Sequence, residues 1–366
     1  MRESLQKLQG LMQDAELDLL ALLPGPNLYY LTGLNFHLME RPTVLFVPSN
    51  GEAAIVLPEL EAERAAETLP DLTRFPYGEA DAERVRAFHE ASRLYHSARQ
   101  LGVEPLRMRF FELELLRESN SAWQLVSAEG VLKELRLRKS TEQVNSMHRA
   151  VLIAEKALQE TLPGIRPGMN EQELAEELII QLLRAGSEPD LPFAPIVASG
   201  PNSALPHATP TDRMLKVGDL LIIDWGARYE GYISDLTRTF SIGPASDTMR
   251  TIHSLVEGAN QAGRQAAHAG VTAGQVDRAA REVIEAGGYG EYFIHRTGHG
   301  IGLEGHEPPG IRAGDDLRLE AGMTFTIEPG IYLPGVGGVR IEDNVAVSEG
   351  GLRTLSSLPR GLVELP

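Results

Sequence analysis

The sequence predicts an α+β protein with two domains, and three observations support this prediction. The chain has 366 residues, which exceeds the length at which a single hydrophobic core usually stops growing. Residues 1–132 mix short apolar runs with helical patterns, as expected of a smaller α/β domain. Residues 133–366 then follow one plan twice, two helices and a strand hairpin, although the two halves share little residue identity. The expected boundary lies at the start of the charged segment 133–139.

The smaller domain is expected to alternate strands with helices. Short apolar runs bounded by turn residues predict the strands, and longer helical patterns predict the helices. The expected strands are 17–23, 43–47, 53–57 and 102–104, and the expected helices are 59–69 and 81–101.

Each helix of the larger domain has a recognisable start. Three begin with a capping box, in which a residue before the helix and a Gln or Glu three positions later satisfy free backbone amides. The boxes are Ser140 with Gln143, Asn170 with Glu173 and Thr272 with Gln275, and Asp247 is the expected cap of the remaining helix. The strand pairs that follow are 219–226 with 231–242 and 323–333 with 338–347.

Composition argues against several classes of protein. A net charge of −17 disfavours general binding to nucleic acid or anionic membrane, because both reward a basic face. The sequence has no cysteine, so any metal must be held by oxygen and imidazole. Acidic residues interrupt the first apolar stretch, unlike a signal peptide, and no window reaches the about 18 apolar residues of a membrane helix. We therefore expect a cytoplasmic protein without nucleic-acid or membrane partners.

Two pairs of carboxylates occupy matching places in the two hairpins. Asp224 and Asp235 lie eleven residues apart around a turn centred just before Glu230, and Glu328 and Glu342 lie fourteen apart around a glycine-rich turn. We expect each pair to be opposed across its hairpin, where buried carboxylates need a cation or a shared proton. For one hairpin alone, exposed acids on an amphipathic strand are the commoner arrangement. The recurrence in both halves favours a buried cluster.

The four carboxylates indicate a metal site. Oxygen ligands without a thiolate favour hard or borderline ions such as Mn²⁺, Co²⁺ or Zn²⁺. Four acids are too many for one ion with an open position, whereas two ions about 3.5–4 Å apart with bridging carboxylates would balance this charge. At least one imidazole ligand is expected as well.

The stretch HRTGHGIGLEGHE, residues 295–307, allows two interpretations. It contains G-x-G-x-x-G, the pattern of a dinucleotide-binding turn, which requires a helix beginning at its last glycine. Here Gly305 is followed by His-Glu-Pro-Pro-Gly, which cannot begin that helix. We instead interpret the glycines as positions where the backbone passes close to metal or substrate. His299 is then the expected imidazole ligand, and His295 a hydrogen-bonded structural histidine.

These motifs resemble those of the pita-bread metallopeptidases, specifically the proline-specific branch of Xaa-Pro dipeptidases (prolidases) and aminopeptidases P. The matching segments are NSALPH at 202–207, DWG at 224–226, SDLTRT at 234–239, TGHGIG at 297–302, HE at 306–307, EPGIY at 328–332 and RIED at 340–343. Residues 26–33 resemble the creatinase-type N-terminal domain of these enzymes. Gly305 departs from the family, which usually has an aliphatic residue there, and this lowers the expected rigidity before His306.

The resemblance implies a pita-bread fold, two divalent ions per chain, foremost Mn, and a homodimer. It implies that Asp235 and Glu342 bridge the two ions. The full set of implied metal ligands is Asp224, Asp235, His299, Glu328 and Glu342. Glu328 would also relay a proton to the leaving nitrogen, His306 would stabilise the oxyanion, and His207 would contact the substrate. Thr237 and Arg340 would orient carboxylates.

Substrate length depends on a group that recognises the carboxylate after proline. Arg41 and Arg312 are the candidates, because a guanidinium binds a carboxylate with two hydrogen bonds, although each could equally be a solvated surface residue. Arg41 on a lid would also block longer peptides, which favours a dipeptidase over an aminopeptidase P. A non-catalytic scaffold is the alternative from outside this activity, and the complete ligand set argues against it. The N-terminal domain and the proline-branch motifs argue against a methionine aminopeptidase.

Overall fold

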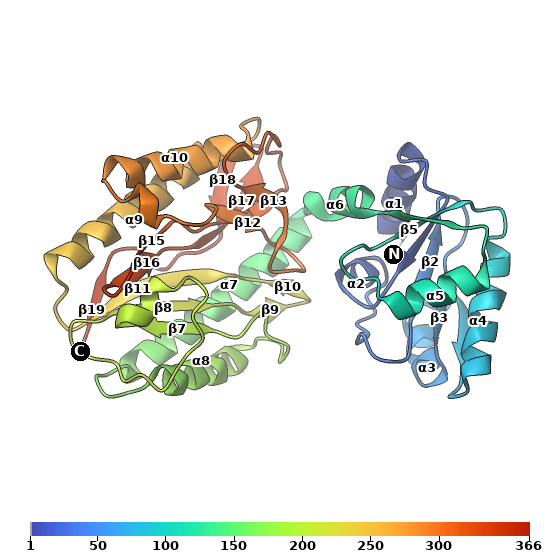
Figure 1. The fold of residues 1–366 in the computed structure, drawn as a ribbon, viewed down its shortest axis with the longest axis horizontal. Coiled ribbons are helices and arrows are strands. Elements are labelled where there is room, and N and C mark those ends of the chain that lie inside the picture. The colour runs from blue at the N-terminus through green and yellow to red at the C-terminus, as the bar shows by residue number, and fades with distance from the viewer. Residues whose placement is uncertain (1) are drawn as a thin grey trace. The chain divides into compact units, whose positions relative to one another are not determined.

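The computed structural model describes residues 2–366, and the chain divides into two compact units, Met1–Arg136 and Leu137–Pro366 (Figure 1). Each unit has its own buried apolar clusters. The boundary expected from the sequence, between residues 132 and 133, falls inside helix α6 (Glu129–Leu137) and stays a prediction.

Unit 1 is built on a sheet that is covered on both faces. Its strands are β1 (Leu19–Leu22), β2 (Val44–Pro48), β3 (Ala54–Pro58), β4 (Thr73–Tyr77), β5 (Gln100–Val103) and β6 (Gln124–Ser127), in the order β4-β3-β2-β1-β5-β6. Its helices are α1 (Arg2–Asp14), α2 (Pro26–Thr32), α3 (Glu59–Thr68), α4 (Asp81–Leu94), α5 (Phe110–Ser119) and α6. Leu20 and Leu22 pack in the cluster that includes α1 and α6, whereas Leu19 and Ala21 pack in the one that includes α4 and α5. Successive residues of a strand thus serve opposite faces.

The helix expected over 81–101 is shorter than predicted. It ends at Leu94, and residues 100–103 form β5 between β1 and β6. Asp18 accepts hydrogen bonds from the amides of Arg99 and Gln100 and so fixes the entry to this strand. Sheet pairing, a tertiary contact, therefore overrides the local helical pattern.

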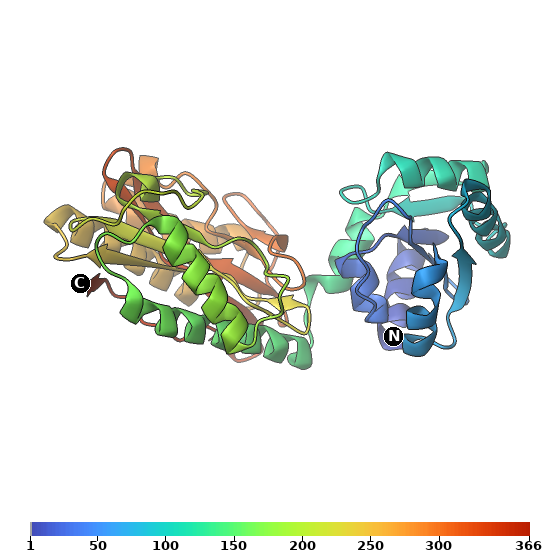
Figure 2. The same ribbon diagram turned by 90° about the horizontal axis from the view of Figure 1, so that it is seen from below.

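Unit 2 places its strands between two helix pairs, α7 with α8 and α9 with α10 (Figures 1 and 2). The helices are α7 (Thr141–Thr161), α8 (Glu171–Ala185), α9 (Asp247–Ala266) and α10 (Ala273–Ala286), with short 3-10 turns η1 (Leu162–Gly164), η2 (Gly200–Ala204) and η3 (Gly290–Tyr292). The strands are β7 (Ile196–Ser199), β8 (Leu220–Trp225), β9 (Arg228–Tyr229), β10 (Tyr232–Ile233), β11 (Leu236–Ile242), β12 (Gly298–Gly300), β13 (Glu307–Ile311), β14 (Thr324–Ile327), β15 (Gly330–Leu333), β16 (Gly337–Arg340), β17 (Asp343–Ser348), β18 (Gly351–Thr354) and β19 (Val363–Leu365). They form the sheets β19-β11-β8-β7 and β13-β12-β14-β17-β18 and the ribbons β9-β10 and β15-β16.

The helix starts of unit 2 agree with the sequence in three of four cases. The capping boxes at Ser140, Asn170 and Thr272 are all formed. The fourth prediction is wrong by one residue: Ser246 caps α9, because its hydroxyl accepts a hydrogen bond from an amide of the first turn, and Asp247 is the first helical residue. Six strands of unit 2 were not predicted, namely β7, β9, β12, β13, β18 and β19. The second strand expected in the first hairpin is divided into β10 and β11, and each of the two strands expected in the second hairpin is also divided in two.

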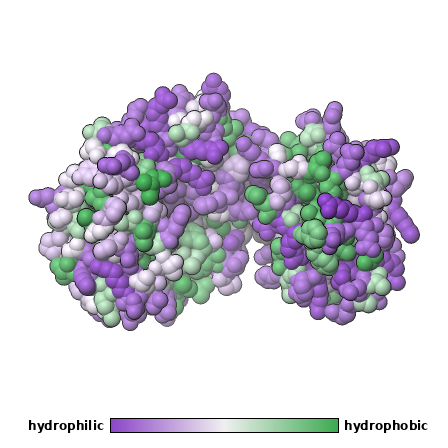
Figure 3. Space-filling view, in the orientation of Figure 1, coloured by the Kyte–Doolittle hydropathy of each residue, from purple (hydrophilic) through white to green (hydrophobic). Residues whose placement is uncertain are grey.

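The surface agrees with the acidic composition. Hydrophilic residues are spread over the visible face of both units (Figure 3). Within the part of the chain that the structure describes, no helix has the length and apolar character needed to cross a membrane.

Candidate active site

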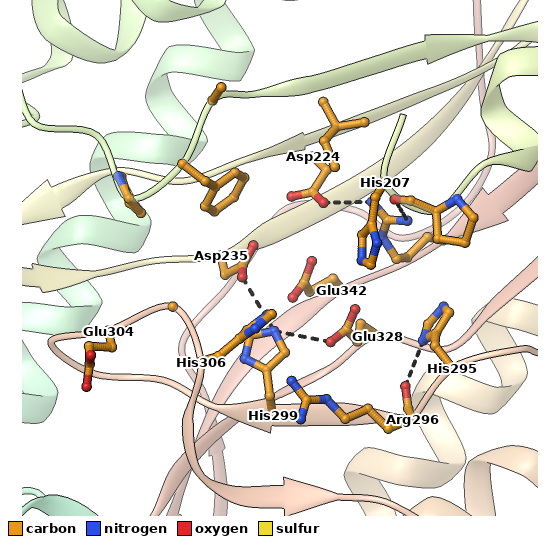
Figure 4. Close-up of a pocket in the computed structure, with 17 residues that line it drawn as sticks. His207, Asp224, Asp235, His295, Arg296, His299, Glu304, His306, Glu328 and Glu342 are labelled. Carbon is orange, nitrogen blue, oxygen red and sulfur yellow. Dashed lines mark hydrogen bonds and ion pairs between the residues drawn. The ribbon is translucent and has the colours of Figure 1, made fainter. Parts of the chain in front are cut away.

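One cavity of unit 2, about 600 Å³ in volume, brings together most of the residues that the sequence singled out (Figure 4). His207 and His306 line it, and so do all five expected metal ligands, Asp224, Asp235, His299, Glu328 and Glu342. Figure 4 shows the carboxylates and the His299 ring turned toward one centre. The volume lies in the range of small-molecule sites.

Asp224 and Asp235 are staggered across the first hairpin, which corrects the register expected from the sequence. Strands β8 and β11 are antiparallel, with Thr237 opposite Asp224. The two-residue turn is Glu230-Gly231, where both residues have positive φ, 51° and 74°, as hairpin twist favours. Its centre lies one residue later than predicted. Asp235 is therefore a diagonal neighbour of Asp224, still within side-chain reach.

Glu328 and Glu342 are opposed, as the sequence predicts. The β14–β17 ladder ends with Ile327 opposite Asp343, and the β15–β16 ribbon continues the same register. Both glutamates lie in the interruption between these two pairs of strands. Their side chains therefore meet where the ladder is open.

The glycines around His299 have a steric cause. A Cβ at Gly298 would lie 1.9 Å from the carbonyl oxygen of Thr326, and one at Gly300 would lie 2.3 Å from the backbone of β13. These two glycines therefore admit neighbouring strands, whereas Gly305 lines the cavity; the proximity of the glycines to metal or substrate stays a prediction. The segment after Gly305 is strand β13 and not a helix, which agrees with the rejection of the dinucleotide motif.

The donor set fits a divalent cation. Ligand atoms of Asp235, His299 and Glu342 lie within 4.8 Å of one another. One oxygen each of Asp224 and Glu342 is buried without a hydrogen-bond partner among residues 2–366. His299 Nδ1 lies 3.1 Å from the next carbonyl oxygen, so Nε2 faces Asp235 at 3.6 Å and Glu328 at 3.3 Å. A cation would satisfy these unpartnered acceptors and this imidazole nitrogen together.

The pKa values reflect the same crowding of buried acids. Burial raises the pKa of Glu328 to about 7. Burial, followed by the charges of neighbouring carboxylates, holds the pKa of Asp235 and of Glu342 well above their usual range. Burial lowers the pKa of His299 to about 3, so its ring is neutral and its free nitrogen can act as a ligand. These shifts favour the protonated forms of Asp235 and Glu342 when no cation is bound, and a cation would displace those protons.

Two polar residues hold carboxylates of this cluster, as the sequence predicts for them. Arg340 Nη2 donates to Asp224 Oδ2 at 2.6 Å. Thr237 Oγ1 donates to Glu342 Oε2 at 2.7 Å. Each bond fixes one oxygen of its carboxylate and leaves the other as the unpartnered acceptor described above.

His207 lies in a loop that a buried carboxylate anchors. Glu171, the first residue of α8, is fully buried. It accepts hydrogen bonds from Ser199, Asn202 and Thr211 on the segment that carries His207. The second helix of the first half thus fixes this side of the cavity.

His306 and His295 differ in their surroundings. The ring of His306 lies edge-on to that of His299, with centroids 4.1 Å apart, and burial lowers its pKa. His295 has a hydrogen-bond partner on both ring nitrogens, the carbonyl of Arg296 at 2.7 Å and the hydroxyl of Tyr332 at 2.8 Å. It is therefore the hydrogen-bonded histidine that we expected.

Neither of the two candidate arginines, Arg41 and Arg312, is among the described residues that line the cavity of unit 2. The side chain of Arg312 is 68% exposed and lies 3.4 Å from Asp315. Arg41 belongs to unit 1, where it pairs with Glu79 at 3.1 Å. Sequence reasoning missed Arg296, which does line the cavity. Its place between His295 and His299 was the available signal.

Two further residues of the site were missed. Asn344 binds the amide and the carbonyl of Asp235 at 3.0 and 2.6 Å. The hydroxyl of Tyr332 accepts a hydrogen bond from Arg340 at 2.9 Å. Both lie at the end of, or directly after, a segment that the sequence had singled out, so proximity to a motif was the only signal.

Comparisons with known proteins agree with this geometry. Residues 145–349 match metallopeptidase family M24, and residues 4–138 match the creatinase/prolidase N-terminal domain. The chain is 35% identical to the Xaa-Pro dipeptidase of Pyrococcus furiosus over 363 residues, which cover 99% of this chain and 100% of that protein.

Solved structures give the same result for the fold. A dipeptidase from Pyrococcus horikoshii OT3 has a TM-score of 0.92 at 38% identity, over 99% of this chain and 100% of that one. The X-Pro aminopeptidase from Thermotoga maritima MSB8 has a TM-score of 0.85 at 31% identity, over 96% and 98%. The predicted pita-bread domain with a creatinase-type N-terminal domain is confirmed. The chain belongs to metallopeptidase family M24, and it is a hydrolase.

Proposed function

We propose that this hydrolase is an Xaa-Pro dipeptidase, which cleaves the imide bond of dipeptides with proline in second position. The observation that carries the proposal is the buried cluster of four carboxylates and His299 in a cavity of small-peptide size. The name of the P. furiosus relative supports the substrate class. Aminopeptidase P, acting on longer peptides, is the second candidate, which the likeness to the T. maritima enzyme favours.

The five cluster residues, Asp224, Asp235, His299, Glu328 and Glu342, would hold two divalent ions. Mn²⁺ is the ion we propose, and Co²⁺ or Zn²⁺ would suit the same oxygen and imidazole donors. Bound there, such ions polarise the scissile carbonyl and lower the pKa of a water molecule. The unpartnered oxygens of Asp224 and Glu342 support this assignment.

Glu328 is the group best suited to move a proton. Its carboxylate lines the cavity, 3.3 Å from His299 Nε2, where a carboxylate can accept a proton from the attacking water. We assign it to take the proton of the attacking water and to deliver it to the proline nitrogen. That nitrogen then leaves as a neutral amine.

The two histidines of the cavity are assigned to the substrate. His306 donates a hydrogen bond to the carbonyl oxygen as negative charge develops on it. His207 contacts the substrate beside the scissile bond. Because an Xaa-Pro bond has no N–H, the site needs no acceptor at that point, and an imidazole edge fits there.

The preference for dipeptides would come from an arginine that binds the carboxylate after proline. Arg296 is the first candidate because it lines the cavity. Arg41 and Arg312 stay as proposals for the same role. Arg296→Met should raise KM for a dipeptide, and Arg250→Met, at an exposed arginine of unit 2, should leave KM unchanged.

One comparison tests the function. The Mn²⁺-loaded protein would be assayed on Ala-Pro and on Ala-Pro-Ala under the same conditions. Cleavage of Ala-Pro with little cleavage of the tripeptide supports the dipeptidase, and the reverse preference supports aminopeptidase P. No cleavage of either peptide with metal bound would contradict both. We also propose a homodimer, as the family resemblance implies, which sedimentation of the purified protein would test. A cytoplasmic location, expected from the sequence pattern, would be tested by cell fractionation.

A further inference from the structure

A buried ion pair lies directly beside the active site and takes no part in the chemistry described above. Lys139 Nζ lies 2.5 Å from Glu307 Oε1, and both side chains are only 3% exposed. Lys139 precedes Ser140, the cap of α7, and Glu307 follows His306 and begins β13. The pair therefore connects the start of unit 2 to strand β13, which begins directly after His306.

The surrounding backbone is shaped to admit this pair. A Cβ at Gly302 would lie 2.5 Å from Glu307 Oε1 and 2.9 Å from Lys139 Cε. Lys139 N donates to the carbonyl of Gly322 at 2.8 Å, and a Cβ at Gly322 would lie 2.7 Å from Lys139 O. Two glycines thus leave room for one ion pair. Burying both charges is costly, and apolar residues of similar size would be at least as stable, so fold stability alone does not explain the pair.

The residues on the two sides of His306 differ in how they can be held. Gly305 has no side chain, and a Cβ there would meet only Ile233 Cδ1, at 3.8 Å, so the preceding residue has no side-chain contact that could orient His306. On the other side, Glu307 is held by the ion pair and lies opposite Gly300 in the ladder of β12 and β13. The His306 ring itself projects into the cavity against His299 (Figure 4).

We propose that the Lys139–Glu307 ion pair is a positioning device that sets the place and angle of His306 in the active site. Its directional hydrogen bond holds the residue after His306 through its side chain, which Gly305 on the other side lacks. Loss of the pair should misplace the His306 donor and weaken stabilisation of the tetrahedral state. Binding of the unreacted substrate and of metal should change little, because His306 bonds the carbonyl oxygen as negative charge develops on it. The inference rests on the proposed function, in which His306 contacts the reacting carbonyl oxygen.

The test compares Lys139→Met and Glu307→Gln with a matched control, Arg138→Met. Arg138 is the preceding residue and forms an ion pair of the same kind with Glu320 at 2.9 Å, but those side chains are 37% and 55% exposed. The double variant Lys139→Met/Glu307→Leu removes both charges together and so leaves neither one buried alone. It provides a folded protein without the pair if a single variant fails to fold.

We expect kcat on Ala-Pro to fall about 10–100-fold in the single variants and at least tenfold in the double variant. KM and Mn²⁺ affinity should stay within about threefold, and Arg138→Met should match the parent protein. A phosphinate analogue of the dipeptide, which resembles the tetrahedral state, should lose affinity in step with kcat. The single effects should not add in the double variant, because both remove one interaction.

Two results would overturn the proposal. One is an unchanged kcat in the folded, metal-loaded variants, which would make the pair a feature of the fold alone. The other is a parallel loss of Mn²⁺ affinity or a rise of KM, which would mean that the pair shapes the whole site and not His306. Failure of the proposed function is a different outcome, since the parent protein itself would then not cleave Ala-Pro.

Discussion

The two hairpins of unit 2 each contribute two carboxylates to the cavity, but in different geometries. In the first hairpin, Asp224 lies on β8 opposite Thr237, and Asp235 lies in the gap between β10 and β11, so the two are staggered. In the second hairpin, Glu328 and Glu342 both lie in the gap where β14 gives way to β15, and there they are opposed. The repeat therefore preserves the number of these carboxylates but not their register.

The two hairpins also hold each other's acids, with one exception. Arg340 of the second half holds Asp224, and Thr237 of the first half holds Glu342. Glu328 differs: among the described residues, its hydrogen bond from Thr326 and its contact with His299 both come from its own half. The difference separates acids that are fixed across the two halves from one that is held locally and suited to carry a proton.

The largest expected effect, on kcat, tests the distinct role assigned to Glu328. Glu328→Gln should lower kcat on Ala-Pro about 10²–10⁴-fold, because the proton carrier is lost, and should weaken one of two bound Mn²⁺ ions. Steady-state kinetics and metal titration would measure the two effects. Glu320→Gln is the control, since Glu320 is an exposed glutamate of the same half. Full activity of Glu328→Gln would remove it from the site.

The next largest effect, on stability, tests the two hydrogen bonds that join the halves, from Arg340 to Asp224 and from Thr237 to Glu342. Arg340→Met leaves Asp224 buried without its counter-charge, so the metal-free protein should lose about 3–5 kcal/mol of unfolding free energy. Thr237→Val removes only a neutral hydroxyl from Glu342 and should cost about 1 kcal/mol. Denaturant unfolding of the metal-free proteins would measure both. Equal losses of unfolding free energy in the two variants would contradict the prediction that Arg340→Met costs more than Thr237→Val.

A smaller effect concerns acid sensitivity in the second half. His253 of α9 is 2% exposed, and burial lowers its pKa to about 4. The unfolded chain binds this proton near pH 6.5, so stability is retained above that pH and lost as pH falls toward 4. When the pH is lowered from 7.5 to 5, the unfolding free energy of the parent protein should fall by about 2 kcal/mol because of His253. His253→Leu should not show this part of the decrease.

Unfolding titrations at the two pH values would measure this difference. His268→Leu is the control, because His268 is an exposed histidine just after the same helix. The assignment to His253 fails if both variants follow the pH dependence of the parent protein.

The smallest effect concerns the loop where the halves meet. A Cβ at Gly305 would contact only Ile233 of the first half, at 3.8 Å, so Gly305→Val should change the unfolding free energy by no more than about 0.5 kcal/mol. Gly305 lines the cavity, so the added side chain should hinder a large first residue of the substrate. The ratio of kcat/KM for Phe-Pro to kcat/KM for Ala-Pro should therefore be about tenfold lower in the variant than in the parent protein. Gly350→Val is the control, as a Cβ there meets no atom within 4 Å. An unchanged ratio would place Gly305 away from the substrate.

Features that depend on neighbours along the chain could be predicted from the sequence. Helix caps at Ser140, Asn170 and Thr272 follow from residues three positions apart, and the spacing of Glu328 and Glu342 around a glycine-rich turn predicts their opposition correctly. The two-domain plan was likewise predictable, because its local patterns occur in a recognisable order.

Contacts between distant segments could not be predicted, because they depend on how the chain packs in three dimensions. The Arg340–Asp224 bond spans 116 positions and the Lys139–Glu307 pair 168, and neither has a periodicity that a sequence pattern could reveal. A shift of one residue in the first turn was enough to move Asp235 from a position opposite Asp224 to a diagonal one. Which carboxylate oxygens stay unpartnered, and so where a cation would bind, depends on these long-range bonds, because packing alone brings their donors together.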